Sequence, residues 1–312
     1  MIIDVHAHVF ASPRLKISPN STTFMSAEDQ IALMAAKGID KAVILPVNNP
    51  ETPAECQSLG EVLSICERHP GRFIPFCNVD PRAPRRPDLI REEDFRYRLE
   101  QYRDFGCKGL GEITARLYWD DPALLCLLGA CQAVEFAVTF HTITPEVNNY
   151  GVMDDLGLPR FEKALRKFPG VKFFGHSPGF WSEISGGVTA KEKNGYPKTP
   201  VRPGGKLKAL MRKYPNLYGD LSAASGFNAL ARDPDHAYEF IDEFQDRLLL
   251  GLDYCSPRND MRHIEWLTAA RDEGRVSAQA WERIMWRNAD RALNLGLARR
   301  RTRARTRTVR VS

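Results

Sequence analysis

The chain has 312 residues, 43% of them hydrophobic and 27% charged, which is sufficient for one α/β barrel of about 250 residues or for two smaller domains. No apolar run reaches the roughly 18 residues that a membrane-spanning helix needs, so we expect no membrane partner. The net charge of +5 depends on the stretch from Arg299 onward, which holds seven arginines and no acidic residue. The body that precedes this stretch is therefore not basic.

The two ends of the chain and its cysteines predict a disordered tail, no signal peptide and reduced thiols. The arginine-rich stretch has no apolar periodicity, so we predict a disordered tail over residues 298–312. Binding of nucleic acid through this tail is a remote alternative, but we expect no nucleic-acid partner because the body lacks a basic face. A strand begins at residue 2, which leaves no room for a signal peptide. The seven cysteines lack paired spacing, as in reduced cytoplasmic proteins.

Short apolar runs alternate with helical patterns along the chain. The apolar runs predict strands over residues 2–8, 41–46, 73–79, 107–113, 137–142, 171–177, 217–222 and 248–254. The remaining patterns predict helices over residues 27–37, 54–68, 87–105, 122–134, 158–168, 205–214, 224–244, 260–271 and 278–295. Gly38 follows the first helix as a typical C-terminal glycine.

Eight repeats of strand and helix predict an α/β fold of one domain, a closed (β/α)8 TIM barrel over residues 1–297. An open doubly wound sheet would need a glycine-rich turn after the first strand, where the chain has His6-Ala7-His8-Val9 instead. The sequence Gly204-Gly205-Lys206 lacks the rest of a phosphate-binding loop, so we interpret it as the start of a helix.

Barrel enzymes carry their chemistry at the carboxyl ends of the strands. Polar residues stand at or near the ends of five predicted strands: His6, His8, Glu112, His141, His176 and Asp253. Imidazole and carboxylate groups gathered at one end of a barrel are ligands for Zn2+, with Mn2+ as the alternative. The other histidines, His69, His236 and His263, fall in helices or loops, where we expect them to be solvated or to cap helices.

Several motifs resemble those of the amidohydrolase superfamily, and within it the branch of aminocarboxymuconate-semialdehyde decarboxylase-like proteins. These motifs extend to about residue 297 and are Asp4-Val5-His6-Ala7-His8, Arg72-Phe73-Ile74-Pro75-Phe76, Asn78-Val79-Asp80-Pro81, Thr139-Phe140-His141, Phe174-Gly175-His176, Tyr214-Pro215-Asn216-Leu217-Tyr218, Gly251-Leu252-Asp253-Tyr254 and Asn288-Ala289. The resemblance implies that His6, His8 and His141 bind metal. It also implies that His176 contacts substrate or a second metal ion, and that Asp253 holds metal and transfers protons.

The segment Gly109-Leu110-Gly111-Glu112-Ile113 departs from the decarboxylase pattern and is more similar to the Gly-Glu-Ile of TatD-like two-metal hydrolases, in which a carboxylate bridges two ions. The two sets of ligands would then be His6, His8 and Asp253 for one ion, and His141 and His176 for the other. The alternative is that Glu112 orients a ligating histidine by a hydrogen bond. The sequence leaves one or two ions open.

A metal ion lowers the pKa of a bound water towards about 7 and so supplies hydroxide at neutral pH. We therefore predict a metal-dependent hydrolase of a lactone, ester or amide, in which Asp253 and His176 are the catalytic residues. Asp253 transfers the proton, and His176 stabilises the developing oxyanion. The same ligands can support decarboxylation of an aromatic or muconate-type acid, and this alternative stays open.

The long segment 178–204 follows the sixth predicted strand and is rich in aromatic and basic residues, which is typical of a lid or pocket wall. We predict that Phe180 and Trp181 of this segment contact a small, flat and anionic substrate, together with Arg116 and Trp119 after the fourth strand. The alternative is that these residues pack a subunit interface, and we expect a homo-oligomer, a dimer.

Overall fold

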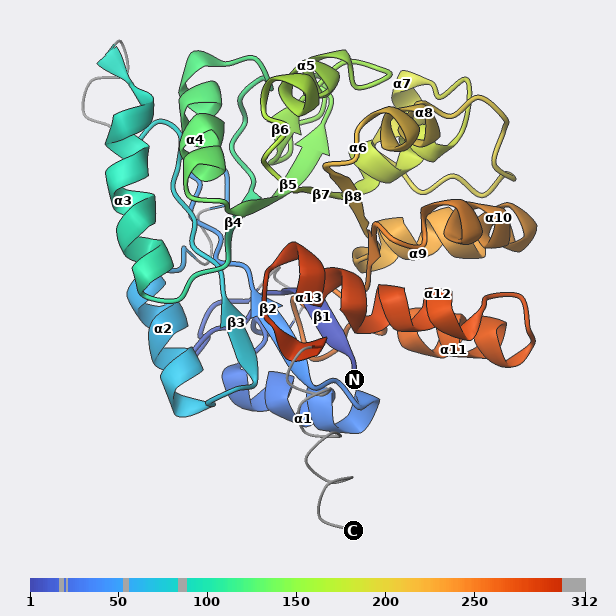
Figure 1. Ribbon diagram of the computed structural model, residues 1–312, viewed down its shortest axis with the longest axis horizontal. Coiled ribbons are helices and arrows are strands. Elements are labelled where there is room, and N and C mark those ends of the chain that lie inside the picture. The colour runs from blue at the N-terminus through green and yellow to red at the C-terminus, as the bar shows by residue number, and fades with distance from the viewer. Residues whose placement is uncertain (17–19, 21, 53–55, 84–88, 299–312) are drawn as a thin grey trace.

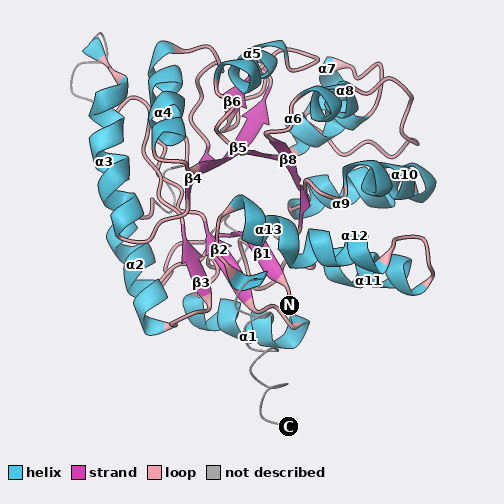
Figure 2. Ribbon diagram, viewed as in Figure 1, coloured by secondary structure: helices cyan, strands magenta, loops and turns pink. Residues whose placement is uncertain are grey.

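The computed structural model describes residues 1–16, 20, 22–52, 56–83 and 89–298. In Figure 1 the strands form a ring at the centre of the molecule, and the helices surround it. Figure 2 separates the two layers by colour, with strands inside and helices outside. The arginine-rich tail predicted after residue 297 lies outside the described residues, apart from Ala298.

All strand pairs in the described chain are parallel, and they form two sheets in the orders β1-β2-β3 and β4-β5-β7-β8-β9, with β6 paired to β5. The strands are β1 (Ile3–Ala7), β2 (Lys41–Ile44), β3 (Phe73–Pro75), β4 (Gly109–Ile113), β5 (Ala137–Ile143), β6 (Val152–Met153), β7 (Phe173–His176), β8 (Leu217–Asp220) and β9 (Leu248–Leu249). Apart from the short β6, each corresponds to one predicted strand.

Backbone hydrogen bonds join the two sheets at both edges and close the ring. At one edge, the Cys77 amide donates to the Gly109 carbonyl at 3.0 Å, so β3 lies beside β4. At the other edge, the Val5 amide donates to the Leu250 carbonyl at 2.9 Å, and the Asp253 amide donates to the His6 carbonyl at 2.9 Å. The predicted TIM barrel is therefore confirmed.

Helices follow the strands and cover the barrel. They are α1 (Ala27–Lys37), α2 (Leu59–Arg68), α3 (Glu92–Asp104), α4 (Pro122–Ala133), α5 (Pro159–Lys167), α6 (Pro178–Trp181), η3 (Ser182–Ile184), α7 (Ala190–Lys193), α8 (Lys206–Lys213), α9 (Ala223–Ala231), α10 (Pro234–Phe244), α11 (His263–Asp272), α12 (Ala278–Glu282), the π-helix η4 (Arg283–Arg287) and α13 (Asn288–Ala292). The predicted helix starts at residues 54 and 87 lie outside the described residues. None of the described helices has the length and apolar composition that crossing a bilayer requires.

Local sequence signals account for several of these helix ends. The Ser26 hydroxyl accepts a hydrogen bond from the Asp29 amide at 3.0 Å and caps the start of α1. Gly38 ends the same helix with a φ of 68°, in the left-handed region that glycine adopts without strain. At the other end of the chain, α13 packs against β9 and lies in front of the strand ring in Figure 1.

Candidate metal centre

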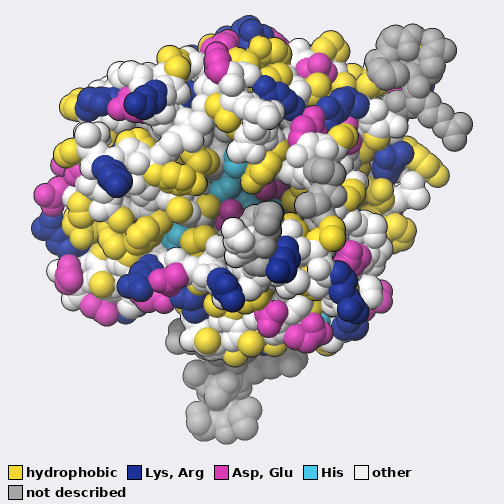
Figure 3. Space-filling view, turned by 180° about the vertical axis from the view of Figure 1, so that it is seen from behind, with side chains coloured by type: hydrophobic (Ala, Val, Ile, Leu, Met, Phe, Trp, Pro, Cys, Tyr) yellow, Lys and Arg dark blue, Asp and Glu magenta, His cyan; other side chains and the backbone are white. Residues whose placement is uncertain are grey.

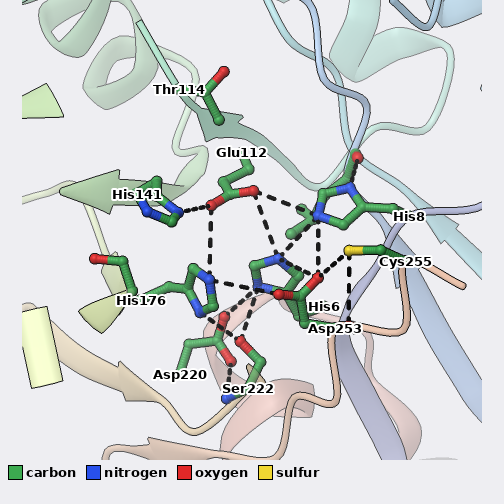
Figure 4. A network of polar contacts seen from close by, with 12 residues as sticks. His6, His8, Glu112, Thr114, His141, His176, Asp220, Ser222, Asp253 and Cys255 are labelled. Carbon is green, nitrogen blue, oxygen red and sulfur yellow. Dashed lines mark hydrogen bonds and ion pairs between the residues drawn. The ribbon is translucent and has the colours of Figure 1, made fainter. Parts of the chain in front are cut away.

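The carboxyl ends of the barrel strands carry a cluster of histidine and acidic side chains, which Figure 4 shows at close range. His6 lies within β1 and Glu112 within β4, and His141 and His176 lie on the neighbouring strands β5 and β7. His141 and His176 are register partners, so the two rings stand at the same level of the sheet. Asp253 follows β9 and completes the group.

Four of these side chains converge on one point. The Nε2 atoms of His6 and His8 lie 3.2 Å apart. Glu112 Oε2 lies 3.7 Å from Nε2 of His6 and 3.4 Å from Nε2 of His8. Asp253 Oδ1 also lies 3.7 Å from Nε2 of His6 and 3.4 Å from Nε2 of His8. Ligands about 2.1 Å from a tetrahedral ion lie roughly 3.4 Å from one another. The spacing of these donor atoms therefore fits a divalent cation.

The other oxygen of Glu112 faces a second set of donors. Glu112 Oε1 lies 3.1 Å from Nδ1 of His141 and 3.8 Å from Nε2 of His176. These three residues form a separate group whose ligand atoms all lie within 4.8 Å of one another. Each carboxylate oxygen of Glu112 thus faces one half of the cluster, as in Figure 4.

The far nitrogens of the histidines are held by a layer of hydrogen bonds behind the cluster. His6 Nδ1 donates to Asp220 Oδ2 at 2.6 Å, and His8 Nδ1 donates to the carbonyl of Leu45 at 2.9 Å. His176 Nδ1 lies 2.7 Å from the Ser222 hydroxyl. These contacts orient the three rings so that their Nε2 atoms face the centre, and a neutral ring with its hydrogen on Nδ1 can offer the Nε2 lone pair to a cation.

Two glycines make room for this arrangement. A Cβ atom at Gly251 would lie 2.2 Å from Asp220 Oδ1 and 3.1 Å from the Cβ of His6. A side chain there would push apart the pair that orients the His6 ring. Gly111 precedes Glu112 with a φ of 138°, and its Cβ would lie 2.4 Å from the carbonyl oxygen of Thr139. Both strand ends therefore depend on the absence of a side chain.

Glu112, Asp220 and His176 have protonation states that suit metal binding. Burial raises the pKa of Glu112, but hydrogen bonds from His141, His6 and His8 outweigh it and hold that pKa well below its usual range. The Asp220 carboxyl likewise has a lowered pKa, because its contact with His6 outweighs burial. Burial and the nearby positive charge of His6 lower the pKa of His176 to about 4. Ionised carboxylates and a neutral imidazole are the forms that bind a cation.

The acidic surroundings also favour positive charge at the centre. Burial lowers the pKa of His6, but the charges of Asp220 and Asp253 outweigh it and raise that pKa well above its usual range. Asp4 lies on the same strand, and its buried carboxylate accepts from the amides of His6 and Leu252. Burial nevertheless raises the pKa of Asp4 to about 7.

The cluster is open to solvent on one side. In Figure 3, histidine and acidic side chains are visible at the floor of a hollow whose surroundings are largely hydrophobic. The Asp253 side chain is 15% exposed, whereas those of His6 and Asp220 are fully buried. The ring of Tyr150 packs against His141 with centroids 4.7 Å apart. Asp253 is thus the acid of the cluster that solvent reaches most readily.

The aromatic residues predicted to contact substrate are core residues in this structure. Trp119 is fully buried and packs against Phe140 and Phe161, with ring centroids 4.7 and 4.6 Å away. Phe180 is fully buried as well, and Trp181 is 2% exposed and donates from its indole N–H to the Asp220 carbonyl at 2.9 Å. Their rings fill the layer between strands and helices, so their positions do not support contact with substrate.

Arg116 and the segment predicted as a lid are also tied into the structure. The Arg116 guanidinium donates to the carbonyls of Pro145 and Asn149 at 2.7 and 3.0 Å. The segment forms α6, η3 and α7, and it contains an ion pair of 2.6 Å between the buried side chains of Lys193 and Glu183. Residues 179–186 of the segment are buried in the barrel wall, whereas residues 187–204 are exposed or half-buried apart from Lys193.

Sequence reasoning also missed residues that the structure brings to the centre. Asp220 ends β8, so the rule that selected the other strand ends applies to it as well. Ser222 and Cys255 follow strands, but small polar residues after a strand are common and carry no comparable signal.

The prediction that His263 is solvated or caps a helix is wrong. This histidine is 1% exposed, and its Nε2 donates to the Ala223 carbonyl at 3.1 Å.

A family model described as Amidohydrolase matches residues 3–295. No curated protein matches the sequence. An amidohydrolase from Burkholderia multivorans with bound zinc is a similar solved structure, with a TM-score of 0.61 and 13% sequence identity over 94% of this chain and 99% of that one.

Two further solved structures have 13% identity each and cover 94% of this chain. One is a probable 2-pyrone-4,6-dicarboxylic acid hydrolase from Acinetobacter baumannii with bound citric acid. The match covers 99% of that protein's chain, with a TM-score of 0.56. The other is a 2,6-dihydroxybenzoate decarboxylase from Rhizobium. The match covers 98% of that protein's chain, with a TM-score of 0.54. At this identity the likeness extends to the fold alone.

Proposed function

The chain belongs to the amidohydrolase family, and from this membership and the geometry of the centre we propose that it is a metal-dependent hydrolase of a small cyclic ester that carries a carboxylate. Zinc is the proposed metal, because imidazole and carboxylate donors at these spacings suit it. Decarboxylation of an aromatic or muconate-type acid is the competing reaction.

The position of Glu112 is the observation that carries the proposal. One of its oxygens faces His6 and His8, and the other faces His141 and His176. A carboxylate in this position can be shared by two cations. A pair of cations is better suited to activating water than to holding one substrate carboxylate, and this favours hydrolysis.

The bound cation would supply Lewis acidity, which lowers the pKa of a water molecule and polarises the ester carbonyl. Asp253 accepts the proton of the attacking water, because it is the most exposed acid of the cluster. Its Oδ1 lies 3.4 Å from His8 Nε2, so the carboxylate stands beside the metal-binding donors. The same carboxyl then gives the proton to the leaving alkoxide. Ser222 and Asp220 hold the His176 and His6 rings in place while this happens.

The nature of the substrate is inferred from the hollow and from the fold's relatives. The largely hydrophobic surroundings of the hollow in Figure 3 suit a ring, and its floor suits a polar reacting group. A hydrolase of a pyrone dicarboxylic acid and a decarboxylase of a dihydroxybenzoic acid share this fold. Both names describe small rings with a carboxylate.

The deciding experiment incubates the zinc-loaded protein with carboxylated lactones and, separately, with aromatic and muconate-type acids. Proton release from a lactone is the expected result, and Asp253→Asn should lower the rate by about 10²–10⁴ while metal is retained. Asp260→Asn is the matched control, because that acid is 64% exposed on the same loop and pairs with Arg262. Release of carbon dioxide without hydrolysis of any lactone would establish the decarboxylase instead.

A further inference from the structure

A thiol stands beside the carboxylate and histidine donors of the centre. Cys255 Sγ lies 3.1 Å from Asp253 Oδ1. Cys255 forms a group of three with Asp253 and His8, and the ligand atoms of this group all lie within 4.8 Å of one another. Figure 4 shows the sulfur turned towards the same space as the carboxylate of Asp253.

Backbone hydrogen bonds fix the main chain of Cys255 beside the centre. The Cys255 amide donates to Asn259 Oδ1 at 3.1 Å, and the Cys255 carbonyl accepts from the Met25 amide at 3.0 Å. The preceding residue, Tyr254, forms a parallel bridge with Ala7 at the end of β1. The closure of the barrel therefore holds the backbone of Cys255 beside the centre, and no rearrangement of the loop is needed to bring the thiol there.

The other cysteines differ from Cys255 in this respect. All seven are free. Among the described residues, Cys255 is the cysteine that belongs to a group of potential metal ligands. Cys77, Cys107 and Cys131 are buried in the core, and Cys126 Sγ lies 3.7 Å from the Ile90 carbonyl on the outer side of the barrel.

We propose that Cys255 is a thiolate ligand of the cation that His8 and Asp253 hold, an inference that rests on the metal centre of the proposed function. On binding, the thiol gives its proton to solvent and the sulfur joins the coordination shell. A thiolate is a soft donor and favours zinc or cobalt over manganese. Cys255 thereby selects the metal in a site whose other donors, imidazole and carboxylate, accept either.

Cobalt substitution tests this assignment without reference to turnover. Metal-free protein is loaded with Co2+, and two absorption features are recorded: visible d–d bands, which report bound cobalt, and a near-ultraviolet sulfur-to-cobalt charge-transfer band, which reports a thiolate ligand. We expect both in the wild type, loss of the charge-transfer band in Cys255→Ser, and its retention in Cys126→Ser. Cys255→Ala repeats the test without a hydroxyl that could replace the sulfur.

Two further readouts use the same proteins. Removal of the metal from the wild type should release one additional thiol that reacts with Ellman's reagent, and this difference should disappear in Cys255→Ser. In a mixture of equal zinc and manganese, Cys255→Ser should take up a larger share of manganese than the wild type.

The possible outcomes separate this inference from the proposed function. Visible d–d bands without a charge-transfer band in the wild type, or a band that persists in Cys255→Ser, would show that the thiol only donates a hydrogen bond to Asp253. In that case the metal centre stands without the thiolate. A charge-transfer band in a protein that hydrolyses no lactone would support the thiolate and reject the hydrolase. Failure to bind cobalt would overturn both.

Discussion

The hydrogen bond between His6 and Asp220 allows a quantitative test of the centre, through the substitution Asp220→Asn. Asp220 accepts at both oxygens, from His6 Nδ1 at 2.6 Å and from the Ser222 amide at 3.1 Å. An asparagine has one accepting oxygen, so its NH2 group must face one of these two donors. Whichever way the amide turns, a buried donor loses its partner, and the orientation of the His6 ring weakens.

The size of the effect can be estimated in two ways that agree. A hydrogen bond to a charged group contributes about 1.5–3 kcal/mol, which corresponds to roughly 10- to 150-fold in a binding constant. Loss of the partner behind a metal-binding histidine typically costs about 10–100-fold in affinity. We therefore expect Asp220→Asn to weaken zinc binding by about 10–100-fold, measured by competition with a chromophoric chelator.

Asp154→Asn is the matched control for this prediction. Asp154 is also a fully buried carboxylate, and it accepts hydrogen bonds from the amides of Asp155, Arg160 and Phe161 at the start of α5, away from the histidine cluster. This substitution should lower stability and leave zinc affinity unchanged. Equal zinc affinity in Asp220→Asn and the wild type would refute the role assigned to Asp220.

Three further predictions concern other parts of the structure. Glu112→Gln should lower the zinc content measured by elemental analysis from about two ions per chain to about one, and an unchanged content would show that Glu112 does not bridge. Lys193→Met leaves the Glu183 carboxylate buried without its 2.6 Å partner and should cost about 3–5 kcal/mol in denaturant unfolding, most of which Lys193→Met/Glu183→Gln should recover. Burial lowers the pKa of His263 to about 4, so the neutral ring contributes stability above pH 6.5 that is lost as the pH falls to 4, roughly 3 kcal/mol in total. His263→Gln should make the unfolding free energy of the metal-free protein less dependent on pH in that range, and parallel curves would contradict the assignment.

The barrel and its family could be predicted because both depend on local patterns. Alternation of apolar runs and helical stretches fixes the order of the strands, and short histidine motifs carry the resemblance to the amidohydrolase superfamily, which is confirmed. The strand-end rule also selected six residues that the structure brings together. Their service as metal ligands stays a prediction.

The aromatic residues could not be placed in the same way, because a ring after a strand has the same sequence signal whether it faces the hollow or the helices. Trp119 and Phe180 are fully buried against strands and helices of the barrel wall. The choice between the two faces is made by packing. Phe180 illustrates this, since its ring occupies the space that a Cβ atom at Gly175 would need, 2.2 Å from that position.

The layer behind the ligands was missed for a different reason, which lies in the closure of the barrel. His6 and Asp220 are 214 positions apart. They meet because β9 pairs with β8, and the residues that follow β9 form backbone hydrogen bonds with β1. Gly251, which follows β9, stands between them, and a Cβ atom there would lie 2.2 Å from the Asp220 carboxylate. The His6–Asp220 contact therefore requires a glycine at position 251. This requirement can be recognised only once the closed barrel is known, because nothing in the local sequence around Gly251 indicates it.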